Sequence, residues 1–150
     1  MSACAPVVYG PSEDITDATY VQAVQAVIDG DESIKSLDKG YFLANSAAPG
    51  FNKTWGVFGT IVVTDKTLYF LFWKRHDNVF QVLRKLPMAD IANIAHATSI
   101  SSPSDYLSIE DKNQRFDVFS YFAMYKPTAH LVKQKNSELL NYLNAVRNAK

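Results

Sequence analysis

The sequence predicts a mainly β domain of the α+β class, with about seven antiparallel strands, a C-terminal amphipathic helix that caps them and an extra helix near the N-terminus. Short β-branched and aromatic runs recur at regular spacing, and polar or proline-containing turns separate them. In the last part of the chain the apolar spacing changes from the strand period of two to a helical period of about 3.6 residues. This order is typical of an antiparallel barrel or sandwich.

A hairpin carries the strongest strand signal. Its strands cover residues 56–64 and 67–73, and Asp65 and Lys66 supply the turn between them. The second strand is an almost unbroken run of β-branched and aromatic residues. Further strands are predicted at residues 41–46, 78–86, 91–100, 105–110 and 114–122.

Two helices flank the strands. Thr16 or Asp17 can cap a helix that runs to about residue 29, where Gly30 ends it. Its apolar stripe, which must lie on another part of the domain, consists of Tyr20, Val24, Val27 and Ile28. The C-terminal helix begins near residue 128 or near residue 136. Its stripe, suited to plug the open end of a barrel, consists of Leu139, Leu140, Leu143 and Val146.

The chain fits a single domain. We expect residues 1–14 to be a flexible tail and residues 15–150 to form the domain, with a core at about 37–147. Fifteen basic residues balance fifteen acidic ones, so the net charge of zero provides no long-range field to attract nucleic acid. The single cysteine, Cys4, excludes an internal disulfide and a cysteine-based zinc site.

Three segments resemble the pleckstrin-homology (PH) superfold, in particular its GRAM and bacterial PH-like branches. They are Gly56-x-Phe58-Gly59-Thr60, Thr64-Asp65-x-Thr67-Leu68-Tyr69-Phe70 and Leu86-Pro87-Met88-Ala89-Asp90-Ile91-Ala92-Asn93-Ile94. In these families a Thr-Asp turn precedes a Leu-Tyr strand, and a Pro-x-x-Asp-Ile-x-x-Ile segment opens the second sheet. The resemblance implies a seven-stranded PH-like barrel capped by the C-terminal helix, and it raises the lipid-headgroup role usual in the family.

The N-terminus resembles the end of a processed bacterial lipoprotein signal, in which Leu-Ser-Ala precedes a lipid-bearing cysteine. Ser2, Ala3 and Cys4 match this motif. The charged and apolar regions of such a signal are missing before them, so either the signal was removed or Cys4 is a chance cysteine. An acylated Cys4 would anchor the domain. Localisation is therefore open between the bacterial cell envelope and the cytoplasm.

No catalytic constellation is found in the sequence. His76, His96 and His130 have no partner at metal-ligand spacing, and the acidic residues are scattered over turns. Phosphate-binding glycine loops and a nucleophile elbow are missing as well. We therefore expect a protein that is not an enzyme and that uses neither a cofactor nor a metal.

The strand at residues 67–73 is apolar on both faces. Tyr69, Leu71 and Trp73 share the face that is not needed for the barrel core. This face must be covered by the helix at residues 17–29, by a second protomer or by a ligand. The three residues are therefore candidates for an interaction surface.

Two further surfaces allow more than one interpretation. Phe51 and Trp55 flank a Pro-Gly loop, where they pack at the barrel mouth, hold a small apolar ligand or form an exposed tip that contacts a membrane or a partner. PH domains that bind lipid headgroups place several cations around the first loop, but this chain has Lys53 alone there. A basic cluster, which is either a solvated surface or an alternative headgroup site, consists of Lys74, Arg75, Arg84 and Lys85.

The sequence thus favours a non-catalytic PH-like interaction module for protein–protein contact or envelope assembly, with self-association and a tether through Cys4 as versions of it. The alternative is a peripheral lipid-headgroup-binding domain that uses the basic cluster.

Overall fold

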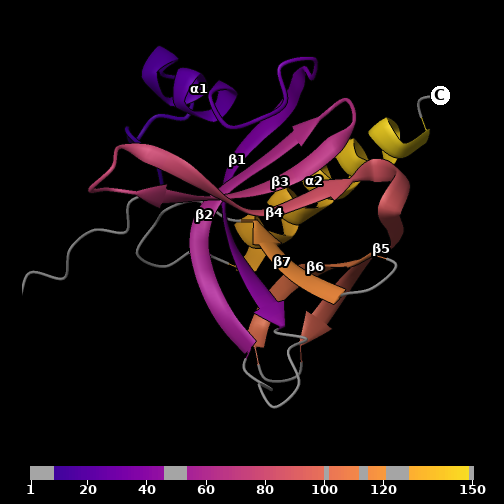
Figure 1. Cartoon of the computed structure of the whole chain (residues 1–150). Helices are drawn as coiled ribbons and strands as arrows, with labels where there is room; N and C mark the ends of the chain where they lie inside the picture. Colours follow the sequence, from indigo (N-terminus) through magenta and orange to yellow (C-terminus); the bar gives the residue numbers. More distant parts are fainter. Residues whose placement is uncertain (1–8, 46–53, 100–101, 112–114, 121–128, 149–150) are drawn as a thin grey trace, which may run out of the picture.

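The structure of the chain is a computed structural model that describes residues 9–45, 54–99, 102–111, 115–120 and 129–148 (Figure 1). In chain order the elements are α1 (Ala18–Gln25), β1 (Ile34–Asn45), β2 (Thr54–Thr64), β3 (Thr67–Lys74), β4 (Val79–Pro87), a 3-10 turn η1 (Met88–Asp90), β5 (Ile91–Ser99), β6 (Ser102–Asp111), β7 (Arg115–Ser120) and α2 (Ala129–Asn148). The predicted class, a mainly β chain with two helices and antiparallel strands, is confirmed.

The strands form one antiparallel sheet, whose order among the described residues is β4-β3-β2-β1-β7-β6-β5. β1 is the central strand. It pairs with β2 from Ile34 to Asn45, with an irregularity near Lys35, but with β7 only over residues 40–44. Within the described part of the chain, residues 34–39 of β1 therefore have a strand neighbour on one side only.

The structure corrects two predicted strand boundaries. β1 begins at Ile34 rather than at residue 41, because Leu37 and its polar neighbours pair with β2 despite their modest strand propensity. β6 begins at Ser102 rather than at residue 105, because Ser102 pairs with Ser99 of β5. In both places strand pairing outweighs the local sequence signal.

One core lies between the sheet and α2. Leu139 and Leu143 of α2 are buried against inward-facing residues of the strands, and Leu140 and Val146 pack at its border. The predicted apolar stripe of the C-terminal helix is confirmed. α2 begins at Ala129, close to the first of the two starts that the sequence allows. The strand residues of this core include Ile61, Val63, Leu68, Phe70, Leu86, Ile91, Leu107 and Ile109.

A second core lies under α1, on the opposite face of the same strands. Tyr20 and Val24 of α1 are buried there together with Val62 of β2. Because Val62 alternates with the two β2 residues of the first core, the two cores occupy opposite faces of the sheet. Figure 1 shows α1 and α2 on different sides of this part of the sheet. The other buried members of the second core are Ile28, Tyr69, Leu71, Trp73 and Phe80.

Part of the predicted tail belongs to the folded domain. The Tyr9 side chain is only 4% exposed, and its ring meets the Phe58 ring edge to face at 5.9 Å. Gly10 is buried beside Tyr20, and a Cβ at this position would lie 2.4 Å from the tyrosine ring. Residues 9 and 10, which belong to the segment 1–14 that we expect to be a flexible tail, are therefore packed against the domain.

Candidate functional site

Buried hydroxyl groups attach the start of the chain and α1 to the sheet. Oη of Tyr20 lies 2.6 Å from Oγ1 of Thr60 in β2. The backbone carbonyl of Tyr9 lies within hydrogen-bond distance of both hydroxyls, at 3.2 Å from Tyr20 and 3.0 Å from Thr60, so the two hydroxyl protons serve three contacts. Burial raises the pKa of Tyr20 to about 12, so its phenol stays neutral at physiological pH. These bonds fix α1 over the strands.

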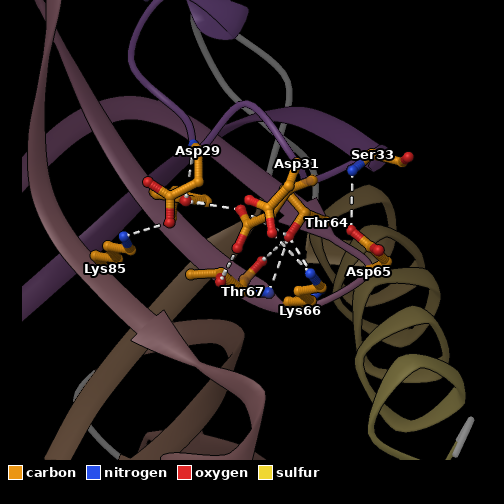
Figure 2. Close-up of polar contacts among 10 residues, drawn as sticks. Asp29, Asp31, Ser33, Thr64, Asp65, Lys66, Thr67 and Lys85 are labelled. Carbon is orange, nitrogen blue, oxygen red and sulfur yellow. Dashed lines mark hydrogen bonds and ion pairs between the residues drawn. The ribbon is translucent and has the colours of Figure 1, made fainter.

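A second attachment joins the connection between α1 and β1 to the turn between β2 and β3 (Figure 2). At its centre, the Glu32 carboxylate accepts hydrogen bonds from the hydroxyls of Thr64 at 3.2 Å, of Tyr69 at 2.7 Å and of Thr67. The Glu32 side chain is half-buried, and these three hydroxyl groups compensate its carboxylate for the lost contact with water. We name this set the polar clasp; it consists of Asp29, Asp31, Glu32, Ser33, Thr64, Asp65, Lys66, Thr67, Tyr69 and Lys85.

Two ion pairs lie at the rim of the polar clasp. Nζ of Lys66 lies 2.9 Å from Oδ2 of Asp31, and Nζ of Lys85 lies 2.6 Å from Oδ2 of Asp29. The hydrogen bond to Asp31 raises the pKa of Lys66, and the one to Asp29 raises the pKa of Lys85. All four side chains are exposed, so water screens these pairs and the hydroxyl bonds to Glu32 are the stronger part of the clasp.

An open groove of about 650 Å³ runs between α1 and the beginning of β1. This volume lies within the range of roughly 300–1,000 Å³ that is common for binding pockets. Glu32 and Ser33 belong both to the groove and to the polar clasp, so the clasp fixes one end of the groove. The apolar lining consists of Ile15, Val21, Ile28, Ile34 and Leu37, and the polar lining of Thr16, Gln25, Glu32, Ser33, Lys35 and Ser36.

The groove lies beside the one-sided part of β1. Residues 34–37 line it, and residues 34–39 pair with β2 alone among the described strands. The groove therefore lies between α1 and the part of β1 that, among the described strands, pairs with β2 alone.

The structure overturns the prediction of an interaction surface at Tyr69, Leu71 and Trp73. Their side chains are 1%, 0% and 7% exposed, because α1 of the same chain covers them. Of the other two candidates, Phe51 lies outside the described residues. Trp55 lies in β2 opposite Ala44, and only its backbone is described. Cys4 is also outside the described residues.

The predicted basic cluster does not form one patch. Arg84 is opposite Phe70, four positions before Lys74 on β3, so the two cations are roughly 13 Å apart along the strand. Lys85 lies on the α1 side of β4, where Asp29 binds it. The four residues therefore do not converge on a single headgroup.

The turn between β3 and β4 exposes apolar and basic side chains together. Phe72 and Val79 are 40% and 47% exposed, although both are large and apolar. Lys74, whose Nζ lies 3.3 Å from Asp77, and the exposed Arg75 stand next to them. We name Phe72, Lys74, Arg75 and Val79 the hairpin tip.

No cluster of metal-ligating side chains occurs within the described part of the chain. His76 is exposed in the β3–β4 turn, whereas the side chains of His96 and His130 are not described. Among the described helices, none is long and apolar enough to cross a membrane.

Comparisons with known proteins identify the fold. No protein-family model and no curated protein sequence matches the chain. The hSac2 domain from the human phosphoinositide phosphatase Sac2 is similar in structure, with a TM-score of 0.54 and 12% identity over 89% of this chain and 85% of that one. The DH/PH domains of a point mutant of p115-RhoGEF give a TM-score of 0.50 and 9% identity, over 91% of this chain and 37% of that one.

The N-terminal PH domain of Vps36 is a further structural neighbour, with a TM-score of 0.44 and 14% identity over 79% of this chain and 86% of that one. Identities this low are informative about the fold alone. The seven-stranded order of the described residues, the C-terminal helix and the two neighbours with TM-scores of 0.54 and 0.50 together show that the chain has a PH-like fold.

Proposed function

We propose that the chain is a non-catalytic PH-like interaction module that binds a protein partner. The observation that carries this proposal is the groove of about 650 Å³ between α1 and β1, which has an apolar wall. An apolar concave surface that the fold itself leaves open is the usual form of a binding site. The sheet closes into a PH-like barrel in this proposal, and α1 is an addition that builds the site.

A photo-crosslinking amino acid at Gln25 tests this proposal, because this exposed side chain lines the groove. In native cells we expect one defined protein to be crosslinked, and we expect the purified partner to bind the purified chain. Val21→Glu, inside the groove, should abolish the crosslink. Gln22→Glu, on the same helix but outside the groove lining, should leave it intact. If no partner is crosslinked, or both variants crosslink equally, the proposal is wrong.

A second candidate function is peripheral binding to anionic membranes through the hairpin tip. Exposed Phe72 and Val79 could enter the acyl boundary while Lys74 and Arg75 meet lipid phosphates. Flotation with phosphatidylserine vesicles should then show binding that salt weakens, and Phe72→Ser with Arg75→Glu should remove it. Binding to neutral vesicles alone, or none, excludes this function.

The finer assignments belong to the same proposal. The chain would be of the GRAM or bacterial PH-like type, because the sequence around Gly59 and Pro87 resembles those families. Cys4 would carry the lipid of an envelope lipoprotein. The DNA immediately upstream of the Met1 codon tests the tether: a basic and apolar signal ending in Leu supports it, and a stop codon contradicts it. With a stop codon there, the proposal becomes an interaction module of the cytoplasm without a lipid tether.

A further inference from the structure

The open form of the groove between α1 and β1 suits a segment of a macromolecule better than a small molecule. Pockets for small ligands enclose roughly 70–90% of the surface of the ligand. A small molecule in this open groove of about 650 Å³ would leave much of its surface in water. A protein segment needs cover on its inward side only, because the rest of its own protein can lie over the opening.

α1 presents a helical row of side chains to the groove. Val21 and Gln25 lie one helical turn apart, and Ile28 follows in the hydrogen-bonded turn that ends the helix. Residues at positions i, i+4 and i+7 form the stripe along which a second helix packs. Ile34 and Leu37 add apolar side chains from β1. The row and the apolar wall together favour an amphipathic helix that lies against α1.

The segment that carries α1 is strongly acidic. Residues 11–32 contain six acidic residues and no lysine, arginine or histidine, although the whole chain has a net charge of zero. The polar clasp uses three of these acids: Asp29 binds Lys85, Asp31 binds Lys66, and Glu32 accepts hydrogen bonds from hydroxyl groups. The other three acids precede or begin α1.

These three acids lie at the end of the groove where α1 begins. Glu13, Asp14 and Asp17 are exposed, and they stand directly before and after residues 15–16 of the groove lining. Lys39 reaches this segment, but it binds the backbone carbonyl of Glu13 rather than a carboxylate. This end of the groove therefore carries a local excess of negative charge.

The groove lining itself adds little net charge. Its charged members are Glu32, whose carboxylate is bound by hydroxyl groups, and Lys35. The acids at the end of the groove therefore select the occupant. They repel nucleic acid and anionic lipid surfaces, and they attract a partner whose groove-facing segment carries basic side chains.

We propose that the groove binds a basic amphipathic helix of a partner protein. The apolar side of this helix enters the groove beside Val21 and Ile28. Its lysine or arginine side chains lie next to Glu13, Asp14 and Asp17 and fix its direction along α1. This inference rests on the proposed protein-binding function and specifies its partner.

Two matched libraries of displayed peptides, selected on the full chain, provide the probe. The peptides have about 14 residues, or roughly four helical turns, with apolar residues at helical spacing. The polar positions hold lysine and arginine in one library and aspartate and glutamate in the other. We expect binders from the basic library alone. A synthetic binder should gain helical circular dichroism on binding, and salt should weaken its affinity.

Variants of the apolar row locate the peptide in the groove. Val21→Asn should weaken binding of the basic peptide at least about tenfold. Gln22→Asn is the matched control, because this residue lies on the same helix but outside the groove lining, and it should change binding less than about twofold.

Charge-reversal variants test the acidic end of the groove. Glu13→Lys should weaken binding of the basic peptide about three- to tenfold at low salt. Glu138→Lys changes the net charge equally, but at an exposed position of α2, which packs on the opposite face of the sheet; its effect should stay below about twofold. Charge reversal in the peptide changes no residue of the chain, so the inference stays testable even if one variant fails to fold.

Several results would overturn the inference. They are the selection of no peptide, equal selection from both libraries, a bound peptide without helical signal, or equal binding to Val21→Asn and the unchanged chain. The crosslink at Gln25 separates this inference from the broader function. Mass spectrometry of the crosslinked protein should identify a basic amphipathic segment. An acidic or extended segment would contradict the inference and leave protein binding in place, whereas the absence of any crosslinked protein would contradict both.

Discussion

The hydroxyl of Tyr20 in α1 lies 2.6 Å from Oγ1 of Thr60 in β2, in a site where both side chains are buried. This contact and the carbonyl of Tyr9 hold three separate segments together. Tyr20→Phe should lower the free energy of unfolding by about 1–2 kcal/mol, because one buried hydrogen bond is lost while the ring remains. Urea denaturation measures the change. Tyr142→Phe, at a 48% exposed tyrosine of α2, is the matched control and should have little effect.

The same phenol predicts a loss of stability at alkaline pH. The pKa of Tyr20 rises from 10.0 to about 12 on folding because burial disfavours the phenolate. The folded state therefore keeps this proton where the unfolded state releases it. The contribution is complete below pH 10 and is lost as pH rises toward 12.

Denaturation curves between pH 9 and about 12 test this dependence. The wild-type chain should lose stability more steeply than Tyr20→Phe. Burial also raises the pKa of Tyr69, and the Glu32 carboxylate adds to this shift, so the variant should still lose some stability. If the free energy of unfolding falls with pH equally steeply in both proteins, the pKa of Tyr20 does not change on folding, and the prediction is wrong.

Glu32 is the residue on which the polar clasp depends. Glu32→Gln should lower the free energy of unfolding by about 1–3 kcal/mol, since an amide nitrogen would face hydroxyl donors such as that of Tyr69. Asp31→Asn removes a partner from an exposed ion pair of the same connection, and it should have a smaller effect that vanishes at high salt. Equal effects of the two variants would contradict the central role of Glu32.

Gly59 of β2 allows the backbone of β3 to come close. A Cβ at this position would lie 2.2 Å from the carbonyl oxygen of Leu71, which belongs to the backbone and cannot turn away. We expect Gly59→Ala to destabilise the chain by about 1–3 kcal/mol. Gly30→Ala, where nothing lies within 4 Å of the new Cβ, should change stability by less than about 0.5 kcal/mol. Thermal unfolding of the two variants measures the difference. A Gly59→Ala variant as stable as the unchanged chain would argue against this close approach of the two backbones.

The sequence predicted the strands and helices whose signal is local. The aromatic run of β3 and the stripe around Leu139 and Leu143 of α2 both lie where their spacing indicates. The beginning of β1 was missed because Lys35, Ser36 and Asp38 have no strand character of their own. These residues become a strand through their pairing with β2.

Most of the candidate site could not be predicted from the sequence, because its residues meet only through the tertiary fold. No local pattern marks Glu32 of the polar segment 31–33, because its partner Thr64 is 32 positions away in sequence. The sequence predicts that the apolar face formed by Tyr69, Leu71 and Trp73 is covered, but which of the three possible covers lies over it depends on the placement of α1. The groove arises from that same placement, and no spacing within α1 or β1 encodes it.

The central claim is that the groove between α1 and β1 binds a protein partner, and photo-crosslinking from Gln25 tests it most directly. The chain with an otherwise unchanged sequence and Gln22→Glu should both crosslink one defined protein, and Val21→Glu should crosslink none. The absence of any crosslinked protein, or equal crosslinking by the two variants, would contradict the claim.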